Sequence, residues 1–238
     1  MGKQIGLRIG KEQVMARVCV FDVNETLLDL KALDADFARV FGDASVRQAW
    51  FNQLIQSALV AIVTDAYAEF GAIGGAALEM TAARRGIALA AADRAQILGG
   101  IRTLPSHPEV PESLARLRRA GLRLAALTNS TLQVAKDQLT HAGLADYFEQ
   151  ILSADMVQRL KPAPEPYRMA AERMGVAIGE MRLIAAHAWD IAGALRAGCA
   201  AAFIARPGMV LDPLAPRPDI VGADLREVAG QILAVELV

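Results

Sequence analysis

The sequence predicts an α/β protein with a doubly wound parallel sheet and an inserted all-helical segment. Apolar runs alternate with helical stretches from residue 104 onward, a pattern typical of βαβ units. The first apolar run, 18–21, shows no polar alternation, as expected for a strand buried on both faces. Residues 31–103 show helical periodicity and no convincing strand.

Length and composition agree with one large domain that carries an insertion. The chain has 238 residues, 54% of them hydrophobic, and a formal net charge of −1. This balance gives no electrostatic reason to expect binding to nucleic acid or to an anionic membrane. No apolar run reaches the roughly 18 residues that span a bilayer, and no signal peptide is evident. We therefore expect a cytoplasmic protein that does not associate with membranes.

Domain boundaries follow from these patterns. We expect a core domain formed by residues 15–30 and 104–238, a helical domain at 31–103 and an N-terminal tail at 1–14. Cys19 and Cys199 lie in apolar surroundings without a metal-binding or redox motif, so we predict two buried thiols in a reducing compartment.

The insertion is predicted to contain several helices. Three glycines between 71 and 75 indicate a turn and close helix packing, and residues 76–85 then form another helix, ended by Gly86. Asp93 is expected to cap a short helix that runs to residue 99. The apolar positions with i, i+3, i+4 spacing are Phe37, Val40, Phe41, Trp50, Leu54 and Ala58.

The remaining core elements follow in alternation. Glycines just after several helical stretches indicate where those helices end. The expected strands are 122–127, 148–153, 183–186, 201–205 and 220–221, and the expected helices are 112–120, 132–142, 166–174, 190–197 and 224–237. Right-handed crossovers make the first strand central and bring the carboxyl ends of the first, second and fourth strands together.

Polar side chains follow these strand ends. Asp22 ends the first strand, where ligands bind in open α/β sheets and where an unpaired buried carboxylate is costly. We interpret Asp22 as a nucleophile, with a turn or capping acid as the alternative. The other polar clusters each have a structural alternative as a helix cap, loop lysine or helix N-terminal acid, but their matching order favours a site. They are Thr26, Thr128-Asn129, Lys161 and His187 to Asp190.

These motifs resemble the haloacid dehalogenase superfamily, and more closely its L-2-haloacid dehalogenase (type II) family. The resemblance covers about residues 16–210. It implies hydrolysis of small 2-haloalkanoic acids to 2-hydroxy acids through an aspartyl ester on Asp22, without metal or cofactor. It further implies that 31–103 is a cap domain and that the protein is a homodimer. The motifs, in family order, are Phe-Asp-x-x-x-Thr-Leu at 21–27, Thr-Asn at 128–129, Lys-Pro-x-Pro-x-x-Tyr at 161–167 and Ala-Trp-Asp at 188–190.

The resemblance implies a role for each matching residue, and chemistry supports it. A carboxylate can attack an electrophilic carbon, and Lys161 would keep Asp22 ionised. Asp190 would pair with Lys161 and help to position water. Hydroxyl and amide groups would orient the nucleophile or the substrate acid, and two aromatic rings would exclude solvent. These residues are Thr26, Thr128 and Asn129 for orientation, and Tyr167 and Trp189 for solvent exclusion.

Two positions favour carbon–halogen chemistry over phosphate ester hydrolysis. Superfamily phosphatases carry a general acid two residues after the nucleophile, where this chain has Asn24. They also place a magnesium-binding aspartate where this chain has Ala186. A magnesium-dependent phosphatase-type hydrolase and a catalytically degenerate binding protein remain the alternatives.

The chain also departs from the dehalogenase pattern. Phe51, followed by Asn52, stands where the family has an arginine that receives the halide or the substrate carboxylate. His187 replaces an asparagine, and we predict that it donates a hydrogen bond or positions water near Asp22. A space-filling histidine is the alternative. Four arginines could supply the missing charge, although solvated surface positions are expected for them: Arg39, Arg47, Arg84 and Arg85.

Overall fold

The computed structural model describes residues 18–236, so the prediction of a tail at 1–14 lies outside the described residues. Within that range one parallel sheet has the strand order β3-β2-β1-β4-β5-β6. This order confirms the doubly wound sheet with the first strand in the centre. The strands are β1 (Val18–Phe21), β2 (Arg123–Thr128), β3 (Gln150–Ser153), β4 (Met181–Ala185), β5 (Ala200–Ile204) and β6 (Ile220–Gly222).

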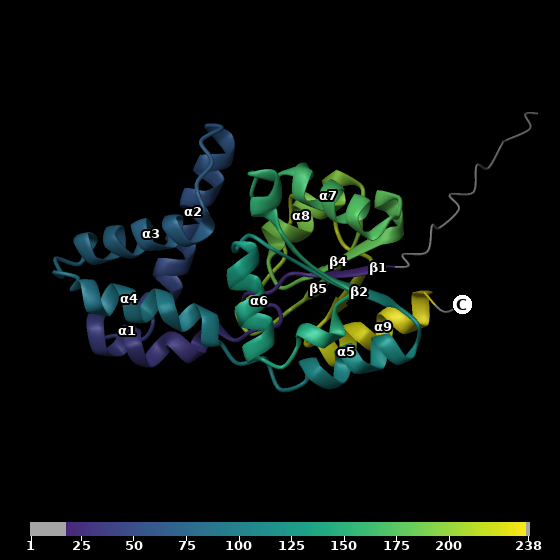
Figure 1. The fold of residues 1–238 in the computed structure, drawn as a ribbon, viewed down its shortest axis with the longest axis horizontal. Coiled ribbons are helices and arrows are strands. Elements are labelled where there is room, and N and C mark those ends of the chain that lie inside the picture. Colours follow the sequence, from purple (N-terminus) through teal and green to yellow (C-terminus); the bar gives the residue numbers. More distant parts are fainter. Residues whose placement is uncertain (1–17, 237–238) are drawn as a thin grey trace, which may run out of the picture.

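Helices cover both faces of the sheet (Figure 1). Alternate residues of β1 enter two different apolar clusters: Cys19 and Phe21 join one, and Val18 and Val20 join the other. This two-sided burial is why the strand carries no polar alternation. Helices α5 (Val110–Arg119), α6 (Leu132–His141) and α9 (Leu225–Glu236) pack into the first cluster, and α7 (Pro164–Met174) and α8 (Ala188–Ala197) into the second.

The segment between β1 and α5 is helical and lies to one side of the sheet (Figure 1). Its helices are α1 (Asp34–Phe41), α2 (Val46–Val63), α3 (Phe70–Arg84) and α4 (Ala91–Gly100). The described residues also contain short 3-10 helices at Leu30–Leu33, Ile101–Thr103, Ala145–Tyr147, Ala154–Val157 and Ile178–Glu180.

Two local predictions for this segment are wrong. The glycines at 71–75 form no turn, because α3 runs through them without a break. Gly74 does allow close packing: a Cβ there would lie 3.1 Å from Leu54 Cδ1, and Trp50 Nε1 donates to the Gly74 carbonyl at 2.9 Å. Asp93 caps no helix, since α4 begins two residues earlier and the Asp93 carboxylate accepts a hydrogen bond from Arg39.

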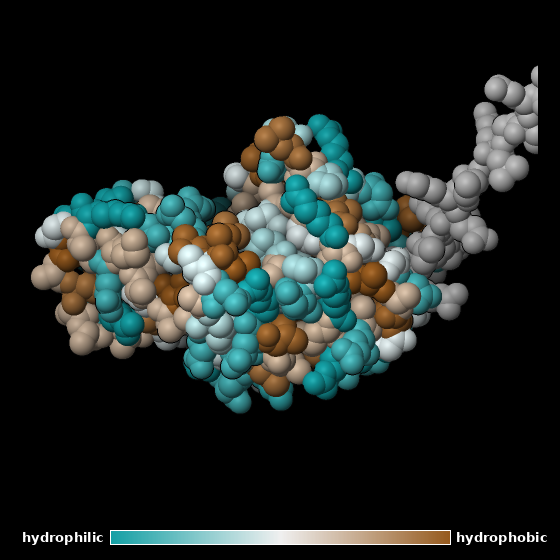
Figure 2. All heavy atoms as spheres, turned by 90° about the horizontal axis from the view of Figure 1, so that it is seen from above, coloured by the Kyte–Doolittle hydropathy of each residue, from teal (hydrophilic) through white to brown (hydrophobic). Residues whose placement is uncertain are grey.

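The surface view shows a smaller lobe beside a larger body, with hydrophilic and hydrophobic residues interspersed on the face shown (Figure 2). No helix within residues 18–236 is long and apolar enough to cross a membrane. Both cysteines are buried and free, which agrees with the predicted buried thiols. Burial raises the pKa of each thiol to about 12.

Candidate active site

Asp22 directly follows β1, and the loop after it turns back on itself. The Asp22 amide donates to the Ile184 carbonyl, which continues the pairing of β1 with β4. The turn brings Thr26 beside the nucleophile candidate, where its hydroxyl donates to Asp22 Oδ2 at 2.6 Å. Thr26 Oγ1 also accepts from the Ala186 amide at 2.9 Å, so the strand ends fix the carboxylate orientation.

Lys161 joins the two buried carboxylates. Its Nζ donates to Asp22 Oδ1 at 2.9 Å, to Asp190 Oδ2 at 2.6 Å and to the Leu127 carbonyl at 2.9 Å. These contacts use all three donors of the ammonium group, which is 0% exposed. These contacts hold Asp22 and Asp190 in fixed positions beside a positive charge.

Two predicted substrate-binding residues support Lys161 and Asp190. Asn129 clamps the Lys161 backbone, accepting from its amide at 2.7 Å and donating to its carbonyl at 3.1 Å. Tyr167 is fully buried, and its hydroxyl donates to Asp190 Oδ1 at 2.5 Å. Tyr167 does not border the small space at Asp22, and its polar end is directed at Asp190, a contact that the sequence did not predict.

Helix α8 approaches this cluster so closely that Gly193 has no room for a side chain. A Cβ there would lie 2.5 Å from Pro162 Cβ and 2.7 Å from Tyr167 Oη. We expect Gly193→Ala to lower the free energy of unfolding by about 1–3 kcal/mol, because the Lys161–Pro162 backbone must move. Urea denaturation measures this. Gly230→Ala is the matched control: it lies within α9 with its nearest contact at 3.6 Å, and we expect it to be neutral or stabilising. Equal stability of the two variants would contradict the argument.

The charges at the site keep Asp22 ionised. Burial alone would raise its pKa, but the Lys161 ammonium, with His187 and Thr26, holds the pKa well below its usual range. Burial raises the pKa of Asp190 against the attraction of Lys161. Burial would lower the pKa of Lys161, and its two carboxylate partners raise it. At neutral pH the site thus presents an ionised, buried and oriented carboxylate.

Aromatic rings from two elements cover this carboxylate. The His187 ring stacks between Phe51 of α2, at 5.7 Å between centroids, and Trp189 of α8, at 5.2 Å. Lys161 Nζ lies 5.9 Å from the centroid of the Trp189 ring. Phe51 therefore provides an apolar wall at the position that the family resemblance aligns with an arginine.

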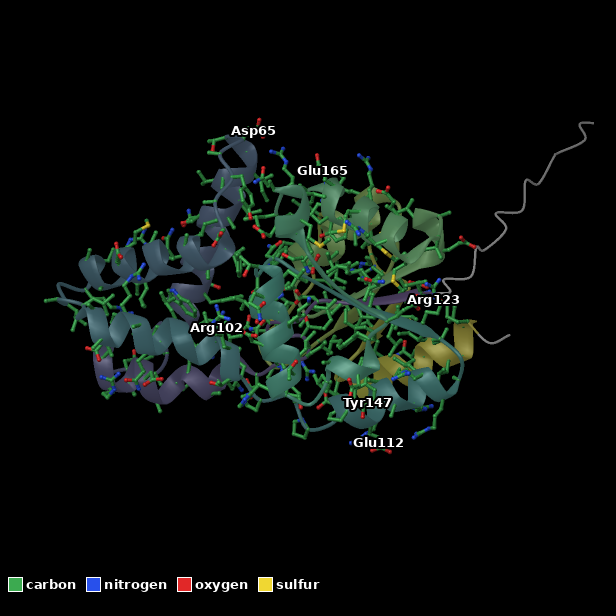
Figure 3. All side chains as sticks on the ribbon, viewed as in Figure 1. Asp65, Arg102, Glu112, Arg123, Tyr147 and Glu165 are labelled. Carbon is green, nitrogen blue, oxygen red and sulfur yellow. The ribbon has the colours of Figure 1, made fainter. Side chains whose placement is uncertain are left out.

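Two neighbouring cavities adjoin the site. The space at Asp22 itself is only about 10 Å³ and is bordered by Phe51, Phe70, Thr128, His187 and Trp189, among others. A cavity of about 340 Å³ lies between the helical segment and the sheet, sharing Asn24, Phe51 and Phe70 with the smaller one. Arg102 lies at the junction of the helical segment and α6 (Figure 3), where it borders the larger cavity and pairs with Asp137.

The two predicted asparagines differ in position. Asn24 is buried, donates to Ser130 Oγ at 3.4 Å and accepts from Gln138 Nε2 at 2.9 Å. Asn52 is exposed and accepts from Gln48. It borders a cavity of about 580 Å³ that shares Phe51, His187 and Trp189 with the space at Asp22, but it does not border that space itself. The structure therefore brings together every predicted site residue except Asn52. The residues that meet are Asp22, Asn24, Thr26, Phe51, Thr128, Asn129, Lys161, Tyr167, His187, Trp189 and Asp190.

Sequence reasoning missed Glu25 and misjudged Arg47. Glu25 is buried and its Oε2 lies 2.9 Å from His187 Nε2. Arg47 is 7% exposed rather than solvated, and it reaches Glu25 Oε1 at 3.5 Å. The sequence did offer a signal for Glu25, because it lies between Asn24 and Thr26 in the loop that follows Asp22. Among residues 18–236, no group of three or more His, Cys, Asp or Glu side chains is arranged to hold a metal ion.

Comparison with known proteins gives consistent similarities. A family model described as haloacid dehalogenase-like hydrolase matches residues 16–198. The (S)-2-haloacid dehalogenase of Pseudomonas sp. (strain YL) is 30% identical over 210 residues, which cover 87% of this chain and 90% of that protein. The (S)-2-haloacid dehalogenase of Xanthobacter autotrophicus is 26% identical, with 81% and 76% covered. A solved L-2-haloacid dehalogenase structure superposes with a TM-score of 0.88 at 26% identity, over 92% of this chain and 99% of that one.

Proposed function

The chain belongs to the haloacid dehalogenase-like hydrolase family, and within it we propose that this protein hydrolyses small 2-haloalkanoic acids to 2-hydroxy acids. The observation that carries the proposal is the buried Asp22 carboxylate, held ionised by Lys161 and facing a small space walled by aromatic rings. A desolvated carboxylate with fixed orientation is suited to attack on carbon.

The reaction follows in two steps. An Asp22 oxygen attacks C2 of the substrate, so that a C–O bond forms while the C–halogen bond breaks and the halide leaves with the electron pair. Lys161 faces the Asp22 carboxylate before this displacement, and it is placed to stabilise the oxyanion that forms when water attacks the ester. Water then attacks the carboxyl carbon of the Asp22 ester and releases the 2-hydroxy acid. Asp190, fixed by Lys161 and Tyr167, is the residue that we assign to positioning this water.

The site is poorly suited to phosphatase chemistry. The Asn24 amide is engaged by Ser130 and Gln138 and has no acidic proton to give to a leaving alcohol. Ala186 contributes no oxygen ligand from its side chain. Both positions support displacement of halide, which leaves as a stable anion without protonation.

The helical segment supports a further part of the proposal. We propose that residues 31–103 act as a cap, because Phe51 and Phe70 from α2 and α3 close the space above Asp22. We also propose that the protein is a cytoplasmic homodimer. Sedimentation equilibrium of the purified protein tests the dimer, and a monomer at micromolar concentration would contradict it.

The decisive experiment is halide release from chloroacetate, fluoroacetate and 2-chloropropionate without added metal. We expect halide from at least one of them. A single turnover in ¹⁸O-water should then label the Asp22 carboxylate, because water oxygen enters the ester carbonyl carbon and remains on the enzyme. Label found only in the product would contradict the ester intermediate. Hydrolysis of phosphomonoesters that needs magnesium, without halide release, would favour a phosphatase instead.

A further inference from the structure

Glu25 occupies an unusual position in the loop that follows Asp22. Its φ is +61°, in the left-handed region where glycine is the favoured residue. A buried glutamate at such a position bears two costs, backbone strain and desolvation of its carboxylate. A side chain retained under these conditions points to a specific contact that the surrounding structure maintains.

The contacts of Glu25 form a chain between the helical segment and the nucleophile. Its Oε2 lies 2.9 Å from His187 Nε2, and its Oε1 lies 3.5 Å from Arg47 Nη1. Arg47 in turn donates from Nε to Asp34 Oδ1 at 2.6 Å. His187 Nδ1 then lies 3.4 Å from Asp22 Oδ2. The imidazole is therefore fixed at one nitrogen by Glu25, while its other nitrogen faces the nucleophile.

The second nitrogen of His187 is available to a ligand. Nδ1 is buried, and its nearest acceptor, Asp22 Oδ2 at 3.4 Å, does not meet it with hydrogen-bond geometry, so a ligand oxygen can take this position. The stacking of the ring between Phe51 and Trp189 prevents it from turning away. The ring also borders the small space at Asp22, so a donor on Nδ1 is directed toward the position of a reacting molecule.

The surrounding charges favour a protonated ring. Burial alone would lower the pKa of His187, but Asp22 and Glu25 raise it to about 9. The cations nearby, Lys161 and Arg47, are each bound to one of these carboxylates. At neutral pH both ring nitrogens therefore carry hydrogen, and Nδ1–H offers a charged donor.

We propose that His187 binds the carboxylate of the substrate through Nδ1–H, and that Glu25 is the positioning residue that orients and charges it. The inference rests on the proposed function, because it assigns the recognition of the acid group in that reaction. It also supplies a cation where Phe51 contributes none. In a 2-haloacid the carboxylate is bonded to C2, so binding it beside Asp22 Oδ2 brings C2 to the nucleophile.

The first test measures the protonation of His187 directly. The chain has three histidines, and NMR of protein with ¹³C-labelled histidine can follow each titration. The signal that disappears in His187→Gln identifies the residue. We expect a pKa near 9 in the native protein and a fall of at least about one unit in Glu25→Gln, which loses the charge but keeps an amide acceptor. A value near 6.5 in the native protein, or no change in Glu25→Gln, would overturn the inference.

Two further variants separate this effect from general destabilisation. Glu25→Gly removes the contact while relieving the left-handed backbone, which offsets part of the stability lost with the buried ion pair, and it should still lower the His187 pKa. Arg39→Gln is the matched control for a charge change in the helical segment, since Arg39 is exposed and pairs with Asp36 and Asp93 of the same segment. It should leave the His187 titration unchanged. Circular dichroism confirms that each variant is folded.

The second test separates carboxylate recognition from turnover. Propionate, which carries no halogen, should shift the His187 NMR signal in the native protein, whereas propionamide should not. In halide-release assays, the preference for 2-chloropropionate over 2-chloropropionamide should fall at least about tenfold in Glu25→Gln, chiefly through KM of the acid. Equal losses for both compounds would indicate a purely structural role for Glu25 and overturn the proposal. Absence of halide release from the native protein would contradict the proposed function, while the propionate shift would still decide the recognition of the carboxylate.

The same arrangement determines how KM for the substrate acid depends on pH. Because the pKa of His187 is raised in the folded protein, the charged ring is present below about pH 9 and is lost as the pH rises through that value. We expect KM for 2-chloropropionate to rise above about pH 9, and at lower pH in Glu25→Gln. KM for 2-chloropropionamide should stay constant over the same range. A KM for the acid that is independent of pH between 7 and 10 would contradict the assignment.

Discussion

Asp22→Asn is expected to reduce halide release from 2-chloropropionate by at least about a thousandfold, which is the scale of losing a covalent nucleophile. The amide is almost the same size as the carboxylate, and its oxygen can still accept the hydrogen bond from Lys161, although its NH2 group cannot accept the one from Thr26. It lacks the negative charge that attacks C2, so the ester does not form. Stopped-time halide assays with freshly purified protein measure the loss.

The control for this variant is a carboxylate of similar size outside the site. Asp93→Asn removes a partly exposed acid that pairs with Arg39, and we expect it to retain native turnover. Thermal unfolding of Asp22→Asn should show a folded protein, because Lys161 keeps its contacts with Asp190 and the Leu127 carbonyl. Halide release by Asp22→Asn within tenfold of the native rate would show that Asp22 is not the nucleophile.

The central part of the site was predictable because its signals are local. A buried strand that ends in an acid, and a lysine and an aspartate placed in order along the chain, can be recognised from short stretches of sequence. The right-handed crossover rule then brings them to one edge of the sheet, where Lys161 contacts both carboxylates. The sheet order follows from the same rule.

Contacts between distant segments were not predictable. The Asn129 clamp on the Lys161 backbone, the Tyr167 bond to Asp190 and the Glu25 bond to His187 depend on side-chain directions after folding. The prediction that Arg47 is solvated was also wrong, because it rested on charge alone and a helical arginine usually faces solvent. Arg47 instead lies against the loop that carries Glu25, since α2 packs above the strand ends.

Local breaks in the helical segment were misjudged for a related reason. Glycine has a low intrinsic helix propensity, so the glycines at 71–75 indicated a turn. In the structure, α3 approaches α2 closely enough for Trp50 to bond to the Gly74 carbonyl, and packing outweighs propensity. Propensity is a weak guide wherever two helices need small residues at their contact.

Lys161→Met should have the second largest effect, and on stability as well as activity. Methionine fills a similar volume without charge, so Asp22 and Asp190 would face each other in the core without the ammonium that joins them. Removing one partner from a buried ion pair costs about 3–5 kcal/mol of unfolding free energy. Urea denaturation should show this loss, and halide release should fall at least about a thousandfold because the nearest charge that holds Asp22 ionised and in position is gone.

A double variant separates the two effects of Lys161. In Lys161→Met with Asp190→Asn, one of the two facing carboxylates is neutral, so part of the lost unfolding free energy should return. Halide release should not return, because nothing restores the charge beside Asp22 or the residue that positions water. A single Lys161→Met variant as stable as the native protein would show that the ammonium is not needed to balance the buried acids. Recovery of activity in the double variant would show that Lys161 acts only through Asp190, and that the ionised state of Asp22 does not depend on it.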